Sequence, residues 1–452
     1  MDDKDKIIKA LEEQNRALQE QVRVLTAKVD ELERRLKLNS TNSSKPPSSD
    51  GLSKKPRTKS LREKGKRKSG GQKGHHGSTL KMKEIPDETI ILSVKICGDC
   101  GEDLSKVKPC HIERRQIFDI PKPQVKVTEY RSEHKTCSCG KRTSASFPSN
   151  VLAPTQYGPR IRAMAVYLNH QQLIPEDRVS MMFEDIFGLS ISPATIASCG
   201  NSASNLLEPW LSELYLWLAA HELKHLDETG FRTAGKTNWL HVICNNYATF
   251  YRISNKRGEM FEDLSGTIVH DHFRSYATIE GVFHALCNAH HLRELIALSE
   301  IEKEAWAKRM ILLLRYANKH REKQDLVRLI YDRIVRNGLD FHELQPPLEQ
   351  TGKRGCKKRR IGHNLLLRLQ NHRDEVLRFL EEEDFPFTNN QSEQDLRMMK
   401  VRMKISGCFR SLKGAEIFCN IRSFVSTCRK QGINVFCEIE NLFQMKLPSL
   451  PT

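Results

Sequence analysis

The chain has 452 residues and carries 73 Lys and Arg against 56 Asp and Glu, a formal net charge of +17. That length exceeds what one compact core usually holds, so we expect two to four domains, and the charge excess favours a polyanionic partner such as nucleic acid. No apolar run approaches a membrane span and the first residues lack a signal-peptide pattern, so neither a membrane protein nor a secreted protein is expected.

Residues 1–38 carry apolar side chains at heptad spacing. The a positions hold Ile8, Asn15, Val22, Val29 and Leu36, and the d positions hold Leu11, Leu18, Leu25 and Leu32. Leu at every d position, with β-branched residues dominating a, favours a parallel two-stranded coiled coil whose polar a residue fixes the register. The alternative is a single amphipathic helix packed on its own protein. The length of the pattern favours the zipper, and therefore a homodimer or higher oligomer.

Residues 39–84 form a polar and basic segment. Between Gly51 and Lys83 there are 12 Lys and Arg and one acid, with almost nothing apolar. Such a segment cannot bury a core, so we expect a disordered arm when it is free. Its charge suits contact with DNA phosphates, and the alternative is a linker that only keeps the protein soluble. The candidate DNA-binding residues in this arm are Lys64, Lys66, Arg67, Lys68 and Lys73.

Residues 85–150 contain two cysteine pairs joined by an alternating stretch from 117 to 131 that predicts a strand. The pairs are Cys97 with Cys100, and Cys137 with Cys139. Four thiolates suit a tetrahedral structural Zn²⁺ and leave no open position for catalysis. Thirteen cysteines, an odd number, also fit a reducing cytosol better than a disulfide framework. Isolated thiols are the alternative, and Cys110 and His134 are spare ligands.

Residues 151–218 are predicted to be helical. Gly188 suits the end of one helix, while Ser192 and Pro193 suit the N-cap and first turn of the next. This layout resembles a helix-turn-helix and makes the segment a candidate DNA-binding domain, although many such helix pairs only pack.

Residues 219–300 predict a mixed sheet with helices on its faces. Strands are expected in HELKHLDETGFR, NWLHVICNN and ATFYRIS, then a helix, a strand in GTIVHDHFRSY, and a strand with its following helix in VFHALCNAHHLRELIAL. Asp227 and Asp271 each close an apolar run. Either acid alone suits a turn, but two acids on neighbouring strands suit Mg²⁺, which takes hard oxygen ligands. A two-ion site that acts on a phosphodiester requires a third acid.

Residues 301–384 are rich in Glu, Lys, Arg and Leu and predict a helical insertion into this core. The insertion contains a basic cluster from Lys353 to Arg360 that either follows DNA or is a solvated loop. Residues 385–445 then supply the last part of the core and C-terminal helices. Two acids occur there, Glu393 and Asp395, and on a helix they lie about 200° apart, so they cannot share one face.

The order of these features resembles the insertion sequence 66 family of bacterial transposases. The motifs that carry the resemblance include NSTNSSKPPSSDG, GGQKGHHG, the cysteine pairs, YGPRIRAMAVYL, HLDETGFR, HDHFRSY, CNAHHLREL, TNNQSEQDLRMMKVRMKISGCFRS and CRKQGINV. They span nearly the whole chain. The resemblance implies a multidomain α/β protein with an RNase H-like core and a helical insertion. A coiled coil, a small zinc-binding β domain and a helical domain would precede that core.

The resemblance also selects site residues. It implies a DDE triad of Asp227, Asp271 and Glu393 that holds Mg²⁺ or Mn²⁺, with Glu228 pointing to the other face of the sheet. His290 and Arg293, which follow the second acid, would support catalysis. Arg397, at i+4 from Glu393, would hold that carboxylate or touch phosphate. A further zinc set of Cys287, His290 and His291 lacks a fourth partner.

The implied function is a DNA transposase that binds element ends, cuts them with metal-activated water and joins the freed 3′ hydroxyls to target DNA. Arg410 is a further candidate DNA contact. The implied partners are DNA, a second copy of the chain and two small accessory proteins of the same element, in a cytoplasmic and nucleoid-associated setting. The alternative is a catalytically silent or domesticated DNA-binding regulator. A zinc-dependent hydrolase is disfavoured by the cysteine-rich ligand set.

Overall fold

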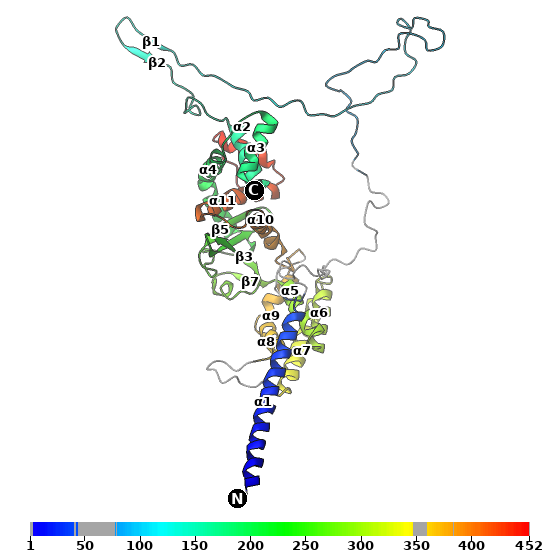
Figure 1. Ribbon diagram of the computed structural model, residues 1–452, viewed down its shortest axis with the longest axis vertical. Coiled ribbons are helices and arrows are strands. Elements are labelled where there is room, and N and C mark those ends of the chain that lie inside the picture. Colours follow the sequence, from blue (N-terminus) through cyan, green and yellow to red (C-terminus); the bar gives the residue numbers. More distant parts are fainter. Residues whose placement is uncertain are drawn as a thin grey trace. The chain divides into compact units, whose positions relative to one another are not determined.

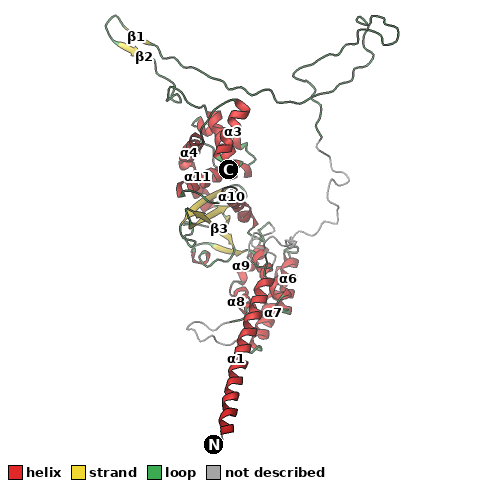
Figure 2. Cartoon of the chain, in the orientation of Figure 1, coloured by secondary structure: helices red, strands yellow, loops and turns green. Residues whose placement is uncertain are grey.

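The computed structural model describes residues 3–39, 42–43, 77, 79–346, 359–382 and 384–451. The chain divides into two compact units, Lys59–Thr128 and the remainder. Helices dominate both views of the chain, and strands in the described residues belong to one hairpin and one five-stranded sheet (Figure 1, Figure 2). None of the described helices is long and apolar enough to cross a membrane.

Helix α1 (Asp3–Lys37) is continuous over 35 residues, as the heptad pattern predicts. Its apolar a and d side chains are exposed in the single chain, from 52% for Val29 to 84% for Leu36. Charged pairs one turn apart, such as Arg35 with Glu31 at 2.7 Å, lie on its surface. The helix is thus formed, and its apolar seam remains open to a partner.

Residues 85–150 hold little regular structure. The predicted strand from 117 to 131 is wrong: these residues form no strand, and Ile117 is 94% exposed. Alternation yields a strand only where a neighbour takes up the backbone hydrogen bonds, and the described chain offers this stretch none. The short hairpin lies further on, where β1 (His134–Thr136) pairs antiparallel with β2 (Arg142–Ser144).

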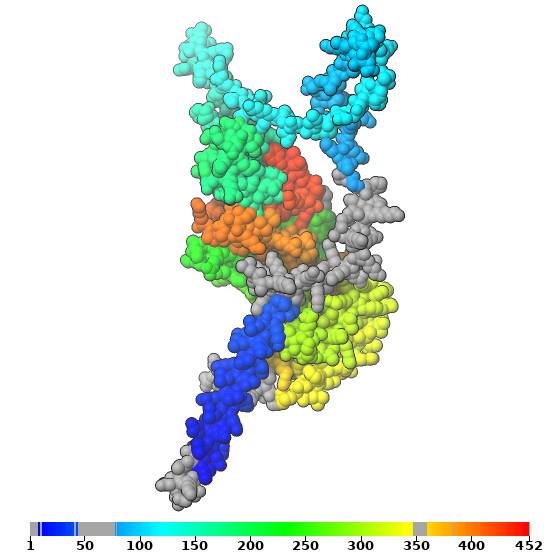
Figure 3. Space-filling model, turned by 45° about the vertical axis from the view of Figure 1, so that its right-hand side comes forward, coloured from blue at the N-terminus to red at the C-terminus, as the bar shows by residue number. Residues whose placement is uncertain are grey.

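The helical segment forms as predicted, with α2, a short π-helix and two longer helices. Their bounds are α2 Pro159–Val166, η2 Tyr167–Gln171, α3 Glu176–Phe187 and α4 Pro193–Ala220. Gly188 ends α3 in the left-handed conformation at φ 60°, and the Ser192 side chain accepts a hydrogen bond from the Thr195 amide at the start of α4. Helix α4 packs on α3 and on the C-terminal helix α11 (Leu412–Lys430), so this helix pair is built into the core (Figure 3, green next to orange).

A mixed sheet follows, which confirms the predicted arrangement of strands. The strands are β3 Leu223–Thr233, β4 Lys236–Cys244, β5 Thr249–Ser254, β6 Thr267–His270 and β7 Phe283–Leu286. Their order is β5-β4-β3-β6-β7; the first three are antiparallel, whereas β6 and β7 run parallel to β3.

The helix predicted between β5 and β6 is wrong. Residues 255–266 form a loop in which Asp263 and Gly266 adopt left-handed backbone angles, φ 53° and 69°. A right-handed helix cannot pass through such residues. Gly266 also lies so close to β3 that a Cβ atom would sit 2.4 Å from the Glu222 carbonyl oxygen, so only glycine fits there.

The predicted insertion is helical, and its buried side chains share one core with β6, β7 and α5. After α5 (Asn288–Glu300) come α6 Ala305–Ala317, α7 Gln324–Glu343, α8 Ile361–Asn371, α9 Arg373–Leu377 and the 3₁₀ turn η4 Arg378–Leu380. Their buried side chains include Trp306, Leu314, Tyr331 and Leu366. Most of the basic cluster from Lys353 to Arg360 lies outside the described residues.

Three C-terminal helices complete the fold: α10 Asn390–Ser406, α11 Leu412–Lys430 and α12 Val435–Phe443. Helix α10 packs on β3 and β4, α11 packs on β5 and α4, and α12 packs on α2. Phe409, Ile421 and Phe424 are buried, and Ile417 is partly buried. The segment that contains Glu393 is thereby held against the central strand of the sheet.

Candidate active site

The two acids predicted from the strands lie on adjacent strands. Asp227 is in the middle of β3 and Asp271 directly follows β6. The parallel register pairs His225 with Val269, so continuing it by two residues brings Asp271 level with Asp227. Neighbouring strands lie about 4.8 Å apart, so the two carboxylates are neighbours across the strand pair.

Glu393 is the third acid, in the first turn of α10, which packs on β3. Burial, followed by the negative charges of Asp271 and Glu228, raises the pKa of Asp227 well above its usual range, and the charge of Glu393 adds to the rise. The three sequence-predicted acids are therefore within electrostatic range of one another. Burial and the neighbouring negative charges thus disfavour the ionised form of Asp227.

The donor set of these acids fits a hard divalent cation. Mg²⁺ and Mn²⁺ take carboxylate oxygens and retain several waters, so three acids on a rigid frame are sufficient. The raised pKa of Asp227 reflects negative charge that a cation would neutralise. Within the described part of the chain, however, no three Asp, Glu, His or Cys side chains already stand at metal-ligand spacing. Side-chain rotation is thus required for all three acids to share an ion.

Glu228 follows Asp227 and belongs to a separate network. Its carboxylate accepts hydrogen bonds from the Arg257 guanidinium at 2.7 and 2.9 Å and from the Tyr276 hydroxyl at 2.5 Å. Tyr276 lies in the 3₁₀ turn η3 (Tyr276–Thr278), shortly after Asp271. Glu228 is only 9% exposed, so it ties the loop after Asp271 to β3 and is not available as a site ligand.

The loop after Asp271 is tightly built. The Asp271 carboxylate accepts a hydrogen bond from the Phe273 amide at 3.0 Å. His272 between them has φ 71°, an uncommon conformation for a residue with a side chain. Such backbone conformations persist where surrounding contacts fix them, and they are frequent at functional sites. The hydrogen bond from the Phe273 amide thus holds the Asp271 carboxylate against its own loop.

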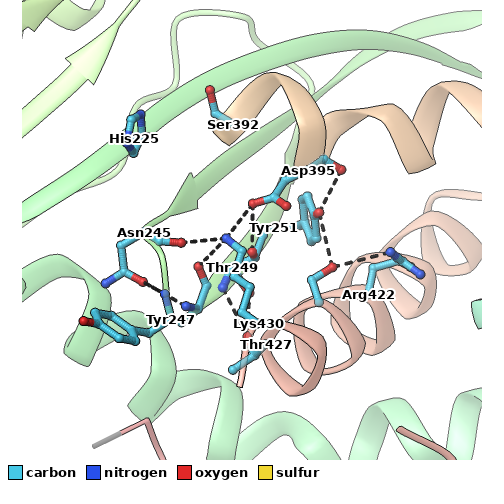
Figure 4. A network of polar contacts seen from close by, with 12 residues as sticks. His225, Asn245, Tyr247, Thr249, Tyr251, Ser392, Asp395, Arg422, Thr427 and Lys430 are labelled. Carbon is cyan, nitrogen blue, oxygen red and sulfur yellow. Dashed lines mark hydrogen bonds and ion pairs between the residues drawn. The ribbon is translucent and has the colours of Figure 1, made fainter. Parts of the chain in front are cut away.

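Asp395 is bound elsewhere, as its position on the helix predicts. Its Oδ2 accepts hydrogen bonds from the Lys430 ammonium at 2.8 Å and the Thr249 hydroxyl at 2.9 Å (Figure 4). Lys430 also donates to the carbonyls of Asn245 and Ala248. The Asp395 side chain is 13% exposed and that of Lys430 12%. Asp395 thus fastens α10 to the β4–β5 turn and to α11, which leaves Glu393 as the acid on the site side.

The cation beside Glu393 comes from α5. Arg293 Nη2 lies 3.3 Å from Glu393 Oε1 and 3.5 Å from His290 Nε2. Arg397, which the i+4 spacing also offered as a partner, is exposed, and among the described side chains it forms no ion pair with Glu393. Burial, followed by the Arg293 charge, lowers the pKa of His290, so its imidazole is neutral at pH 7.

The second nitrogen of His290 has no partner. Its Nδ1 is buried and, among the described residues, unbonded. Since Nε2 faces a guanidinium and must accept, the neutral ring carries its proton on Nδ1. His290 therefore offers a free donor near Asp271 and Glu393, whose charges both act on it.

The further zinc set of Cys287, His290 and His291 is not formed. Cys287 Sγ accepts a hydrogen bond from the Asn389 amide at 3.1 Å, and burial raises the pKa of Cys287 to about 11. His291 Nδ1 bonds Asn288 Oδ1 at 3.2 Å. These side chains are engaged in packing and in local hydrogen bonds.

The two cysteine pairs form similar turns. In the first, the Cys97 amide donates to the Glu102 carbonyl and the Gly101 amide to the Cys97 carbonyl; in the second, Cys137 and Gly140 repeat the pattern. Both glycines are left-handed, at φ 77° and 83°. Backbone amides, first that of Cys100, lower the pKa of Cys97 to about 7, and the Cys139 amide lowers that of Cys137. Thiolates stabilised in this way suit Zn²⁺.

The first pair belongs to the unit Lys59–Thr128 and the second to the other unit. Among the spare ligands, His134 Nδ1 bonds the Ser144 hydroxyl at 2.5 Å across the β1–β2 hairpin, and Cys110 is an exposed free thiol. Each cysteine pair thus forms a turn within its own unit.

The predicted DNA contacts lie mostly outside the described residues. This is true of Lys64, Lys66, Arg67, Lys68 and Lys73. Arg410 is described and exposed. The exposed face of α10 also carries Arg397, Lys400 and Lys404, at spacings that place them in one row from the site outward.

The sequence did not predict three residues at or beside the site: Arg257, Tyr276 and Asn389. Tyr276 lies inside HDHFRSY and Asn389 inside TNNQSE, so membership of these motifs was the available signal. Nothing near Arg257 in the sequence marks it, because its partner Glu228 is a contact across the fold.

Comparison with known proteins shows to which class of protein the chain belongs. Residues 154–417, more than half of the chain, match a family described as Transposase IS66 family, and residues 95–140 match the zinc-finger binding domain of transposase IS66. The first match places the chain among the transposases. The chain is a member of the IS66 transposase family, as the sequence motifs predicted. The second match spans both cysteine pairs and supports structural zinc.

Two further matches cover less of the chain. Residues 3–81 match a family of unknown function, DUF6444. Uncharacterized protein y4jO of Sinorhizobium fredii (strain NBRC 101917 / NGR234) is 39% identical over 70 residues, which are 16% of this chain and 22% of that relative. The chain therefore spans less than a quarter of the curated relative that it matches.

Proposed function

We propose that this IS66-family member is an active DNA transposase whose acids Asp227, Asp271 and Glu393 carry out metal-dependent cleavage of element ends and strand transfer. The observation that carries the proposal is the register of β3 and β6, which sets Asp271 level with Asp227, together with α10, which brings Glu393 to the same strand. The strand order β5-β4-β3-β6-β7 further supports an RNase H-like core.

Two strand-exchange steps follow from this site. Water attacks the phosphorus at the element end and loses a proton to solvent. The bond between phosphorus and the 3′ oxygen breaks, and that oxygen takes up a proton from solvent to become a 3′ hydroxyl. That hydroxyl then attacks a target phosphodiester, one bond forms as one breaks, and no covalent enzyme intermediate is needed. Bound Mg²⁺ or Mn²⁺ would activate the attacking oxygen and neutralise charge on the leaving oxygen.

The neighbouring side chains have supporting roles in this proposal. His290 Nε2 lies 3.5 Å from Arg293 Nη2, so the neutral imidazole accepts from the guanidinium and helps to orient it beside Glu393. Arg293 would then neutralise charge on the scissile phosphate. Arg397 and Arg410, both exposed, would contact the DNA backbone.

Recognition of the ends is assigned to the N-terminal half. The basic arm of 39–84 would follow phosphates, with the zinc-binding segment of 85–150 and the helical segment of 151–218 beside it. Our proposed domain scheme consists of these segments together with a catalytic core, residues 219–300 and 385–445, and a helical insertion, residues 301–384. Because the proposed substrates are DNA, we propose that the protein acts at the nucleoid. Accessory proteins of the same element would be further partners.

Dimerisation is assigned to α1. Its apolar seam is at least 52% exposed along its length, and Leu occupies every d position. A parallel pair would bury this seam and match the two element ends that have to be joined.

We expect the purified chain to join its own element ends to a plasmid when Mg²⁺ or Mn²⁺ is present and not when the metal is chelated. Because the pKa of Asp227 is raised, metal must displace a proton there, so the half-saturating metal concentration should fall as pH rises. If one proton is released, the half-saturating metal concentration can fall by at most about tenfold per pH unit. Gel analysis of joined products between pH 6.5 and 8.5 measures both the requirement for metal and this pH dependence.

Duplexes with scrambled ends provide the control for specificity. Binding of the ends without any metal-dependent product would instead identify a DNA-binding regulator. Joined product in the presence of chelator would exclude the proposed site.

We also expect zinc content to depend on both cysteine pairs. Changing Cys97 and Cys100 to Ser, or Cys137 and Cys139 to Ser, should reduce bound zinc from about one ion per chain to nearly none, because two ligands do not hold a structural site. Elemental analysis of the purified protein measures this. Cys110→Ser is the matched control and should retain the metal; zinc retained by both double variants would show that the four ligands are misassigned.

A further inference from the structure

We propose that Asn389 is the positioning residue that sets Glu393 against Asp227. This inference deepens the proposed function and rests on it. Asn389 is the N-cap of α10, four residues before Glu393, and is 1% exposed. It contacts the three elements that carry the site, namely β3, α5 and α10.

The side chain of Asn389 binds β3 beside the first acid. Its Nδ2 donates a 2.7 Å hydrogen bond to the carbonyl of Leu226, the residue directly before Asp227. Its Oδ1 lies 2.9 Å from His225 Nδ1. Because Nδ2 is committed to a carbonyl, Oδ1 must accept, so His225 carries its proton on Nδ1. One amide is thus fixed by two neighbouring residues of the strand.

The backbone of Asn389 binds α5 and α10. Its amide donates to Cys287 Sγ at 3.1 Å, at the start of the helix that carries His290 and Arg293. Its carbonyl accepts from the Glu393 amide at 3.3 Å and from the Ser392 hydroxyl at 3.0 Å. The first turn of α10 therefore has a fixed origin relative to both β3 and α5.

Asparagine suits this position better than its close analogues. Alanine would leave the Leu226 carbonyl and His225 Nδ1 buried without partners. Aspartate has the same shape, but it loses the donor to Leu226 and places a carboxylate oxygen against a carbonyl. His225 itself is 5% exposed, and burial lowers its pKa to about 4, with Asn389, Lys430 and Asp395 as the other groups that act on it. The interaction thus requires a neutral acceptor and a neutral imidazole.

Asn389→Asp is the main test, and Asn390→Ala is its matched control because Asn390 is adjacent on the chain but exposed. We expect Asn389→Asp to reduce single-turnover strand transfer by about tenfold to a hundredfold, since displacement of a reacting group by an ångström costs about that much. The affinity for DNA should stay unchanged, and Mn²⁺ titration should show about tenfold weaker binding. Asn390→Ala should stay within about twofold in both assays.

The Mn²⁺ titration separates positioning from a general loss of structure. Partial unfolding lowers the number of Mn²⁺ sites per chain and leaves the affinity of each remaining site unchanged, whereas displacement of Glu393 weakens the affinity of every site. Circular dichroism and thermal unfolding report the folded fraction.

Three results would overturn the inference. In the first, Asn389→Asp has the same strand-transfer rate and the same Mn²⁺ affinity as wild type. In the second, the rate of Asn389→Asp falls only in proportion to its unfolded fraction. In the third, the wild-type protein binds no Mn²⁺ at a site that requires Glu393. Mn²⁺ binding that depends on both Glu393 and Asn389, without strand transfer by the wild type, would contradict the proposed function and leave the positioning role supported.

Discussion

Replacing Glu393 with Gln should lower strand transfer by about a thousandfold while the fold is retained. Glu393 is the carboxylate that α10 brings to β3, and its neutral isostere cannot help to balance a divalent ion. The loss of one anionic ligand from such a site is worth several kcal/mol of transition-state stabilisation, and about 4 kcal/mol is a thousandfold. Single-turnover joining of element ends to plasmid measures the change.

The stability of Glu393→Gln should differ little from that of wild type. The Glu393 side chain is 36% exposed, and the ion pair that it forms within the described part of the chain, with Arg293, is a 3.3 Å contact. Metal binding should weaken in the same variant. A strand-transfer rate equal to that of wild type would remove Glu393 from the proposed triad.

Replacing Asp395 with Asn should have the opposite effect. The protein should lose much of its stability, whereas the strand-transfer rate of the folded fraction should fall only slightly. The change leaves the Lys430 ammonium, whose side chain is 12% exposed, without its anion. Removing one partner of a buried pair costs about 3 kcal/mol or more, which lowers the unfolding midpoint by roughly 6–10 °C. Thermal unfolding measures this directly, and activity at a low temperature measures the rate of the folded fraction.

A more exposed pair provides the control. Glu381 lies 3.1 Å from Arg378, and its side chain is 43% exposed. Glu381→Gln should therefore cost about 0.5 kcal/mol or less. If Asp395→Asn were as stable as Glu381→Gln, the anchoring role of Asp395 would be excluded.

Much of the fold was predictable because it depends on local physics. Gly188 and Ser192 mark helix ends through backbone conformation and capping, which act within one turn, and both occur where predicted. The two wrong elements depend on non-local factors. The stretch 117–131 alternates like a strand but has no neighbour to pair with, and 255–266 is turned into a loop by Gly266 at its contact with Glu222.

The candidate site was predictable in part. Asp227 and Asp271 could be found because each follows an apolar run, although only Asp271 lies at a strand end and Asp227 lies within β3. Helix geometry separated Glu393 from Asp395, but the choice of Glu393 came from the family resemblance. The pairing of Glu393 with Arg293 spans 100 positions of sequence, and no local pattern encodes such a contact. The same holds for Asn389, whose partners on β3 are equally remote.

The late position of α10 in the chain has a consequence for synthesis. Both strand acids leave the ribosome before the insertion, whereas Glu393 emerges after it, and the ion pair that joins α10 to α11 forms only when Lys430 arrives. A prematurely terminated chain therefore carries α1 and the cysteine pairs without Glu393. Under the proposed function, such shortened chains would occupy element ends without cutting them, and each would compete with the full-length protein.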